Sequence, residues 1–481
     1  MSGKKLSIPA LIKNDPFLRA FCVNANARIF DISGFFSPIS IKDQLIRACW
    51  LIEKVLDLEI ISKDAKLLIV GAGPAGIAAA ITAKSKGIKD ITIIEKTKAV
   101  AEVLNTASRN IDFVQYDWAA EHWQAGIFPL SGIEGIIPFV LNSNKPRNAK
   151  KIIEKARYKS GIAPFHEIVI EKVEPKKGKV KVQFKPASNP KTPIPSTSTF
   201  DMALSCIGYG LENVQVKKSK FRAYEFWRMR NHLEYRKNFE QKILICGGGD
   251  GALQDFLLLA TNKNMAKDIY RGLDLPAKLK AEIEKNIFRI EERLKRKEVW
   301  LDKESPNYFT ESCELYSRLQ KVHLNQVRKV LKNARVMNNL KKMLTKLVLN
   351  GNLNLTFFCN HFSACYPLNR FLVLLISEYL TTQSNNPVLS SCKVDKITSA
   401  EKIHKCNLKE DDCAKYKHKV IFSHRCKCDS EIACKCVPKP AVKTAKIFDK
   451  IIIRFGIDRV NPIFGRPPAL PGMQILPYSL P

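Results

Sequence analysis

A glycine-rich turn between a predicted strand and a predicted helix constrains the fold of this chain more than any other feature. The segment Val70-Gly71-Ala72-Gly73-Pro74-Ala75-Gly76 follows an apolar run at 67–70 and opens an alanine-rich stretch that ends near Lys86. In a G-x-G-x-x-G turn, the first glycine permits a tight bend, the second lets a pyrophosphate approach the backbone, and the third lets the helix pack on the strand. The pattern therefore predicts a βαβ unit that binds a dinucleotide through residues 71–76.

An acidic residue completes this unit. A second apolar strand is predicted at 91–94, and it ends at Glu95, which Lys96 follows. A carboxylate at this place can accept hydrogen bonds from the hydroxyls of an adenosine ribose. The elements of the motif occur in the expected order: strand, turn, helix, second strand and acidic residue. Glu95 and Lys96 are therefore candidate binding residues together with the glycine turn.

Residues 67–95 resemble the FAD fingerprint of flavoproteins with two dinucleotide-binding domains, which include thioredoxin reductase-like enzymes and flavin monooxygenases. The resemblance is specific over these residues and looser from there to about residue 260. It implies an FAD-dependent oxidoreductase that uses NAD(P)H and acts on a small-molecule substrate. It also implies that Gly71, Gly73 and Gly76 lie at the FAD pyrophosphate and Glu95 at its ribose.

A second glycine-rich turn, Cys246-Gly247-Gly248-Gly249-Asp250-Gly251-Ala252, follows another apolar strand predicted at 242–246. In one interpretation, Gly247, Gly249 and Ala252 form a second phosphate-binding turn, which resembles the NADPH turn of thioredoxin reductases. In another, Gly249 and Asp250 are the late Gly-Asp of such flavoproteins, whose aspartate holds the ribityl chain or the pyrophosphate of the same FAD. In a third interpretation, the turn is purely structural and binds no ligand. Under the first two interpretations, Gly247, Gly249, Asp250 and Gly251 are candidate cofactor-binding residues.

The chain has 481 residues, enough for two to four domains. The predicted fold class is α/β, with a Rossmann-type FAD-binding domain, a β-rich crossover, a helical basic insertion and a cysteine-rich insertion. We expect the FAD-binding sheet to be interrupted by the helical region, and the chain to return to a sheet near Ile451. The predicted division is an N-terminal extension and helix at 1–60, a Rossmann-like domain at 61–260, a helical basic region at 261–352, and the C-terminal part of the sheet domain at 353–481, with the cysteine-rich insertion at 392–440.

The 14 cysteines contain no Cys-x-x-Cys pair, so a dithiol relay is not expected. With no secretory signal at the N-terminus, they indicate reduced thiols and a cytoplasmic location. The apolar stretch at 371–376 is far too short to span a membrane. Four cysteines, Cys426, Cys428, Cys434 and Cys436, are spaced closely enough to converge on one zinc ion. The alternative is a cysteine-rich surface insertion without metal.

Basic residues dominate the chain, whose net charge is +33. A stripe of apolar residues from Leu319 to Val348 predicts an amphipathic helix with a basic opposite face. From Arg318 to Lys346 there are nine basic residues and no acidic one: Arg318, Lys321, Arg328, Lys329, Lys332, Arg335, Lys341, Lys342 and Lys346. Such a face binds nucleic acid phosphates or is simply solvated.

Two other functions therefore stand beside the flavin oxidoreductase. One is a flavin-dependent enzyme that modifies RNA, and the other is a non-catalytic dinucleotide-binding scaffold or sensor. No catalytic side chain can be named from the sequence, because a flavin ring itself performs the hydride chemistry and requires little from side chains.

Overall fold

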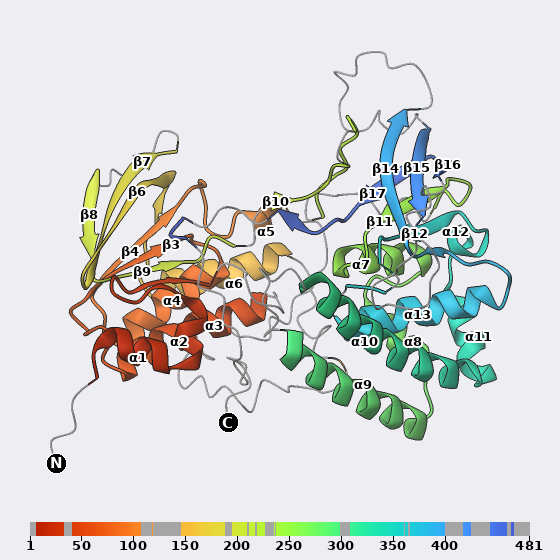
Figure 1. Cartoon of the computed structure of the whole chain (residues 1–481), viewed down its shortest axis with the longest axis horizontal. Coiled ribbons are helices and arrows are strands. Elements are labelled where there is room, and N and C mark those ends of the chain that lie inside the picture. The colour runs from red at the N-terminus through yellow and green to blue at the C-terminus, as the bar shows by residue number, and fades with distance from the viewer. Residues whose placement is uncertain are drawn as a thin grey trace.

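The computed structural model describes residues 6–32, 41–106, 118, 146–187, 195–208, 211–216, 219–226, 235, 237–298, 308–359, 361–363, 366–399, 417–424, 443–458 and 463–465. These residues form two α/β units, each built on its own sheet of parallel strands (Figure 1). A short antiparallel ribbon of β10 (Leu211–Glu212) and β18 (Ile457–Asp458) runs between the two units.

The first sheet has the order β1 (Cys22–Asn24), β2 (Ile29–Asp31), β9 (Met202–Ser205), β3 (Lys66–Val70), β4 (Asp90–Glu95) and β5 (Phe165–His166). All neighbours pair in parallel except β1 and β2. Alternate residues of β3 point to opposite faces of the sheet, as the strand pleat requires. Leu67 and Ile69 are buried on one face and Leu68 and Val70 on the other, so the strand packs against other elements on both faces.

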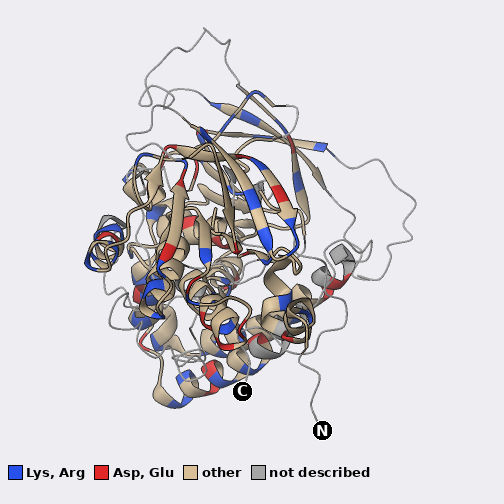
Figure 2. Ribbon diagram, turned by 90° about the vertical axis from the view of Figure 1, so that its left-hand side faces the viewer, with Lys and Arg blue, Asp and Glu red and all other residues tan. Residues whose placement is uncertain are grey.

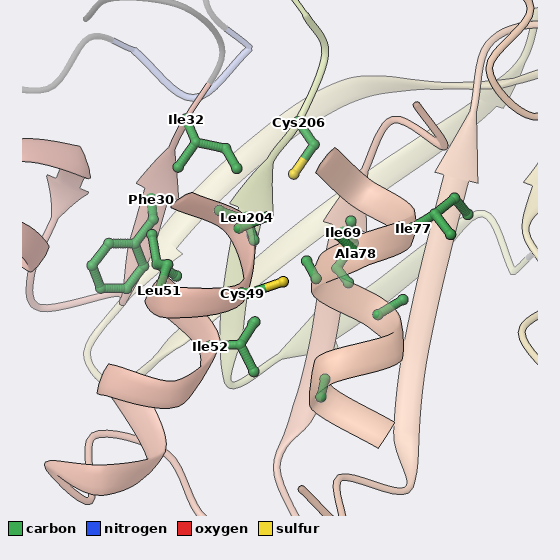
Figure 3. Close-up of a cluster of buried hydrophobic side chains, with 14 of the residues drawn as sticks. Phe30, Ile32, Cys49, Leu51, Ile52, Ile69, Ile77, Ala78, Leu204 and Cys206 are labelled. Atoms are coloured by element: carbon green, nitrogen blue, oxygen red, sulfur yellow. The ribbon is translucent and has the colours of Figure 1, made fainter. Parts of the chain in front are cut away.

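Helices cover one face of this sheet, and an antiparallel three-stranded sheet covers the other. Figure 3 shows part of the helical side, where Cys49 and Ile52 meet Ile69 and Ala78. The helices are α1 (Ile8–Asn14), α2 (Pro16–Phe21), α3 (Ile41–Asp57), α4 (Pro74–Ser85), α5 (Val103–Thr106) and α6 (Pro146–Lys159). The three antiparallel strands are β6 (Ile168–Lys176), β7 (Lys179–Pro186) and β8 (Thr197–Phe200).

The N-terminal extension is part of this sheet. Strand β2 pairs in parallel with β9, and the register joins Ile29 to Ala203 and Asp31 to Ser205. A strand of three residues is too short to display an alternating pattern, so the sequence showed no strand before the helix at 41–57. Strands β1 and β2 therefore extend the sheet beyond β9, and β2 lies next to β9.

The second sheet has the order β13 (Val388–Leu389), β12 (Leu353–Thr356), β11 (Ile243–Cys246) and β17 (Lys450–Ile453), and all its strands are parallel. The chain does return to a sheet near Ile451, but β17 pairs there with β11 of this second sheet and not with a strand of the first sheet. A strand–turn–helix pattern predicts local structure but contains no information on which strand becomes the partner. The predicted domain boundary at residue 260 lies between β11 and its two neighbours in the sheet, β12 and β17. It therefore divides the strands of one sheet between domains.

The layers of the second unit repeat those of the first. An antiparallel sheet of β14 (Cys392–Ser399), β15 (His418–His424) and β16 (Lys443–Phe448) packs on one face of the parallel sheet. Helices pack on the other face. They are α7 (Asp250–Ala260), α8 (Ala266–Gly272), α9 (Ala277–Glu298), α10 (Tyr308–Leu331), α11 (Ala334–Met343), α12 (Lys346–Leu349) and α13 (Pro367–Thr381).

The predicted basic helix is divided among α10, α11 and α12. The first break has a local cause, because the side chain of Asn333 accepts a hydrogen bond from the Val336 N–H at 3.2 Å and so caps α11. Apolar residues such as Val327, Leu340 and Leu347 remain buried on both sides of the breaks. Among the described residues, no helix is both long enough and apolar enough to cross a membrane.

Candidate dinucleotide-binding sites

Two of the three glycines in the first turn are required by packing. Gly71 has φ of +102°, and a Cβ there would lie 2.6 Å from the carbonyl oxygen of Cys206, which follows the neighbouring strand β9. A Cβ at Gly76 would overlap the Gly71 carbonyl oxygen. These glycines bring β3 and helix α4 together, as the sequence pattern predicts, and they also let the turn approach the end of β9, which the pattern does not predict.

Gly73 differs from the other two glycines, because a Cβ built on it would meet no atom of the described residues within 4 Å. It is the N-cap residue of α4, and no side chain caps the helix there. Pro74 occupies the first helical turn, where a missing N–H costs nothing. The open backbone at the positive end of α4 therefore leaves room for the pyrophosphate of a dinucleotide.

Glu95 lies at the turn, as predicted. Its Oε2 accepts a hydrogen bond from the Ala72 N–H at 2.8 Å, and its Oε1 accepts from the Thr97 N–H at 2.9 Å and hydroxyl at 2.8 Å. These bonds hold the carboxylate at the end of β4, and Oε2, which accepts only one of them, keeps a lone pair for a further donor. Lys96 is exposed beside it, and its part in binding stays a prediction.

The second turn has the same backbone design. Gly247 has φ of +139°, and a Cβ there would overlap the carbonyl oxygen of Arg454, which follows β17. A Cβ on Gly249 would meet nothing within 4 Å, and Gly249 is the N-cap of α7. Ala252 is fully buried in the place of the third glycine. The turn therefore has an open backbone at a helix N-terminus on the second sheet, which supports its interpretation as a second phosphate-binding turn.

The side chains around the second turn differ from those around the first. The Gly71 N–H donates to the Ile94 carbonyl, and the Gly247 N–H donates to the Thr356 carbonyl, both at 2.8 Å. Phe357 follows Thr356 as Glu95 follows Ile94, so it occupies the place that Glu95 has in the first unit. A Cβ on Gly248 would lie 3.3 Å from the Phe357 Cβ. The sequence did not single out Phe357, because 110 residues separate it from the turn and only the strand register brings the two together.

Arg454 and Asp255 form a buried ion pair behind the second turn. The Arg454 Nε donates to Asp255 Oδ2 at 2.8 Å, and the two side chains are 4% and 0% exposed. The guanidinium also lies 5.5 Å from the ring centre of Phe226, whose edge is close to Gly251. This pair was not expected from the sequence, since its members lie on a helix and a strand end almost 200 residues apart.

Asp250 contacts the start of α13. Its Oδ1 accepts a hydrogen bond from the Tyr366 N–H at 2.9 Å and one from the Asn369 amide at 3.4 Å. The carboxylate therefore connects the N-termini of α7 and α13. Its contact with a cofactor, like that of Gly251, stays a prediction.

The thiols near the two turns are not suited to redox chemistry. Burial raises the pKa of the Cys206 thiol well above its usual value, and the negative charge of Asp31 raises it further. Burial alone raises the pKa of Cys246. Such thiols are protonated and weakly nucleophilic near neutral pH.

Within the described residues, no three His, Cys, Asp or Glu side chains form a group that could hold a metal ion. The proposed zinc ligands Cys426, Cys428, Cys434 and Cys436 lie outside the described residues.

The nine basic residues of the predicted helix are all exposed. Several of them pair with acids: Arg318 with Glu314, Arg328 with Glu378, Lys329 with Glu282, and Arg335 with Asp274. Three of these acids lie on other segments, so a window on the sequence could not show them. Figure 2 also shows Lys and Arg spread over many elements of the face in view. These observations support a solvated surface rather than a dedicated nucleic acid site.

Residues 68–187, less than half of the chain, match the family model described as pyridine nucleotide-disulphide oxidoreductase. Among solved structures, bacillithiol disulfide reductase from Bacillus cereus is 11% identical, with a TM-score of 0.41 and coverage of 82% of this chain and 78% of that one. Ornithine N-hydroxylase from Kutzneria sp. 744 is 11% identical, with a TM-score of 0.38 and coverage of 82% and 81%.

Thioredoxin reductase from T. acidophilum is 11% identical, with a TM-score of 0.35 and coverage of 82% and 78%. Values this low carry neither substrate nor mechanism over to this chain. No curated protein matches it significantly. The family match covers the first glycine turn, Glu95 and the start of the β-rich crossover, and confirms the resemblance seen in the sequence: over residues 68–187, the chain is similar to the pyridine nucleotide-disulphide oxidoreductases.

Proposed function

We propose that this protein is an FAD-dependent oxidoreductase that takes its electrons from NAD(P)H and acts on a small molecule. The observation that carries the proposal is the open backbone of Gly73 at the N-terminus of α4, beside the carboxylate of Glu95. Bound FAD would supply the hydride chemistry through its isoalloxazine ring. The family match over residues 68–187 supports the same assignment.

The residues of the first turn have separate roles in this proposal. The N–H groups at the start of α4 donate to the pyrophosphate, and the helix dipole stabilises its charge. Glu95 accepts hydrogen bonds from the adenosine ribose while it remains bonded to Ala72 and Thr97. Gly73 contributes by having no side chain, because a larger residue would fill the place of the phosphates.

The second turn is the proposed site for NAD(P)H. Gly249 gives it an open backbone at the N-terminus of α7, so a second pyrophosphate can bind there. At the end of β12, Phe357 replaces both the carboxylate that would favour NADH and the basic side chain that would favour NADPH. We therefore propose a nicotinamide dinucleotide as the electron donor without a choice between the two.

One observation favours a second function, a dinucleotide-binding protein that does not use NAD(P)H. Phe357 offers no hydrogen bond to a ribose, so the second turn lacks a contact that the first turn has. Anaerobic titration of the purified protein separates the two functions. An oxidoreductase that uses NAD(P)H loses its flavin absorbance when NADH or NADPH is added. A protein that only binds the cofactor is bleached by dithionite but by neither nucleotide.

Replacing Asp250 tests the assignment of the second turn. We expect Asp250→Ala to keep its flavin and to raise the KM for NAD(P)H about tenfold, because the loss of the bond to the Tyr366 N–H loosens the start of α13 beside the turn. Flavin content and anaerobic reduction kinetics measure the two effects. Asp274→Ala, at an exposed surface pair of the same unit, is the matched control and should change neither. Loss of flavin from Asp250→Ala alone would show that this aspartate serves the FAD instead.

A further inference from the structure

An aromatic side chain from the first unit's part of the chain packs into the second unit. Trp118 lies in the sequence between α5 and α6, and both of these helices pack in the core of the first unit. Its ring centre nevertheless lies 5.1 Å from that of Tyr270 on α8 and 5.2 Å from that of Phe371 on α13. In Figure 1, α5 and α6 lie on the side of the first unit that faces the second. Trp118 therefore joins the two units by a contact separate from the β10–β18 ribbon.

Both partners of the Trp118 ring are held firmly by their own unit. Phe371 is fully buried, and Tyr270 is 8% exposed and donates a hydrogen bond from its hydroxyl to Glu284 on α9 at 3.0 Å. The rings of Trp118 and Tyr270 meet edge to face, with an angle of 76° between their planes, which is a favourable arrangement for two aromatic rings. Trp118 packs against the hydrophobic core of the second unit. Separation of the units would expose this apolar surface to water, so the contact opposes their relative motion.

Helix α13 connects this contact to the second glycine turn. Tyr366 is the N-cap residue of α13, and Asn369 lies in the first turn of the helix. Both donate hydrogen bonds to Oδ1 of Asp250, at 2.9 Å and 3.4 Å. Phe371, which contacts Trp118, follows two residues later on the same helix. One rigid element thus has the second turn bonded to its start and the tryptophan of the first unit packed on its next residues.

The orientation of the two units matters for the proposed reaction. Hydride transfer from a nicotinamide to a flavin requires the reacting atoms to lie about 3–3.5 Å apart. In the proposed function, the first unit holds the flavin and the second holds the nicotinamide, so this distance depends on how the units are fixed to each other. The β10–β18 ribbon joins Leu211 to Asp458 and Glu212 to Ile457, and a two-stranded ribbon this short has little stability of its own. A contact that reaches α13 restrains the second turn more directly.

We propose, on the basis of the proposed function, that Trp118 is a positioning residue for hydride transfer. It holds the turn that binds NAD(P)H in a fixed orientation relative to the turn that binds FAD, and it acts through Phe371 and α13. Each dinucleotide is bound by residues of one unit. Removal of the tryptophan should therefore slow the transfer step and leave the binding of both dinucleotides unchanged.

Anaerobic stopped-flow reduction of the holoenzyme by NADH and by NADPH tests this role. We expect Trp118→Ala to lower the limiting rate of flavin reduction about 10- to 100-fold, because small errors in alignment have effects of this size. The flavin content and the dissociation constant of the nucleotide should not change. Trp118→Phe keeps a ring beside Tyr270 and Phe371 and should restore most of the rate. Trp50→Ala is the matched control, since Trp50 packs on Phe17 within the first unit, and it should leave the rate unchanged.

Small-angle X-ray scattering provides a second measurement, which does not depend on flavin chemistry. Trp118→Ala should have a larger radius of gyration than the wild type at unchanged helix content, and Trp50→Ala should not. An unchanged radius, or a limiting rate of reduction that is unchanged or faster, would overturn the proposal. A slower rate accompanied by loss of flavin or of helix content would assign Trp118 to folding instead. If neither nucleotide reduces the wild type, the proposed function itself is refuted, and scattering alone then shows whether Trp118 fixes the two units.

Discussion

Replacing Gly73 with valine should produce a folded protein that has lost its flavin. A Cβ at this position would meet no atom of the described part of the chain within 4 Å, and the backbone φ of −72° and ψ of −176° are well suited to valine. The valine would instead fill the space that the pyrophosphate needs. We expect the affinity for FAD to fall at least about 100-fold, with no loss of secondary structure. Flavin absorbance of the purified protein and far-UV circular dichroism measure the two quantities.

Two further variants make this test specific. Gly249→Val introduces the same side chain at the equivalent open position of the second turn, and it should keep its flavin while reduction by NAD(P)H slows. Gly76→Ala should impair folding, because its Cβ would overlap the Gly71 carbonyl oxygen. A Gly73→Val protein with its full flavin content would show that the cofactor does not bind at this turn.

Replacing Arg370 with leucine should destabilise the second unit strongly. The Arg370 Nη1 donates to Glu291 Oε1 at 2.6 Å, and His323 Nε2 lies 2.8 Å from the same oxygen. All three side chains are at most 5% exposed, and they join α13, α9 and α10. Leucine would leave the charge of Glu291 buried without its guanidinium partner. We expect the free energy of unfolding, measured with urea, to fall by about 3–5 kcal/mol.

An exposed ion pair elsewhere in the second unit provides the comparison. Arg335 and Asp274 form a pair whose side chains are 70% and 56% exposed. Arg335→Ala should change the free energy of unfolding by less than about 1 kcal/mol, because solvent screens such pairs. If Arg370→Leu had an equally small effect, the buried cluster would not be what holds α9 and α10 against α13.

Local features of the fold could be predicted from the sequence, and partnerships between distant segments could not. The strand, turn and helix around Gly73 follow from apolar runs and glycine spacing within some 30 residues, a range over which patterns are reliable. The pairing of β2 with β9 joins segments more than 170 residues apart, and β2 is too short for a pattern of its own. The second sheet was missed for the same reason, since nothing in the run at 243–246 indicates which strands lie beside it.

The candidate site divides in the same way. Glu95 was predicted because it ends a strand shortly after the glycine turn, at the spacing typical of the motif. Phe357 has the equivalent place in the second unit, but five helices lie between it and the end of α7, so no spacing rule identifies it. Trp118 belongs by sequence to the first unit and reaches α8 and α13 only through the arrangement of the two units. Residues that only the topology brings together can be identified only from the structure.

Identification of the cofactor in the wild-type protein tests the central claim most directly. The protein is purified without added flavin, the chromophore is released with acid, and the released molecule is identified by chromatography and mass. The arrangement of Gly73 and Glu95 predicts FAD, because the open turn has room for a pyrophosphate and the carboxylate can bind an adenosine ribose, two groups that FAD contains and FMN lacks. The absence of a flavin, or the release of FMN, which has no adenosine for Glu95 to bind, would contradict it.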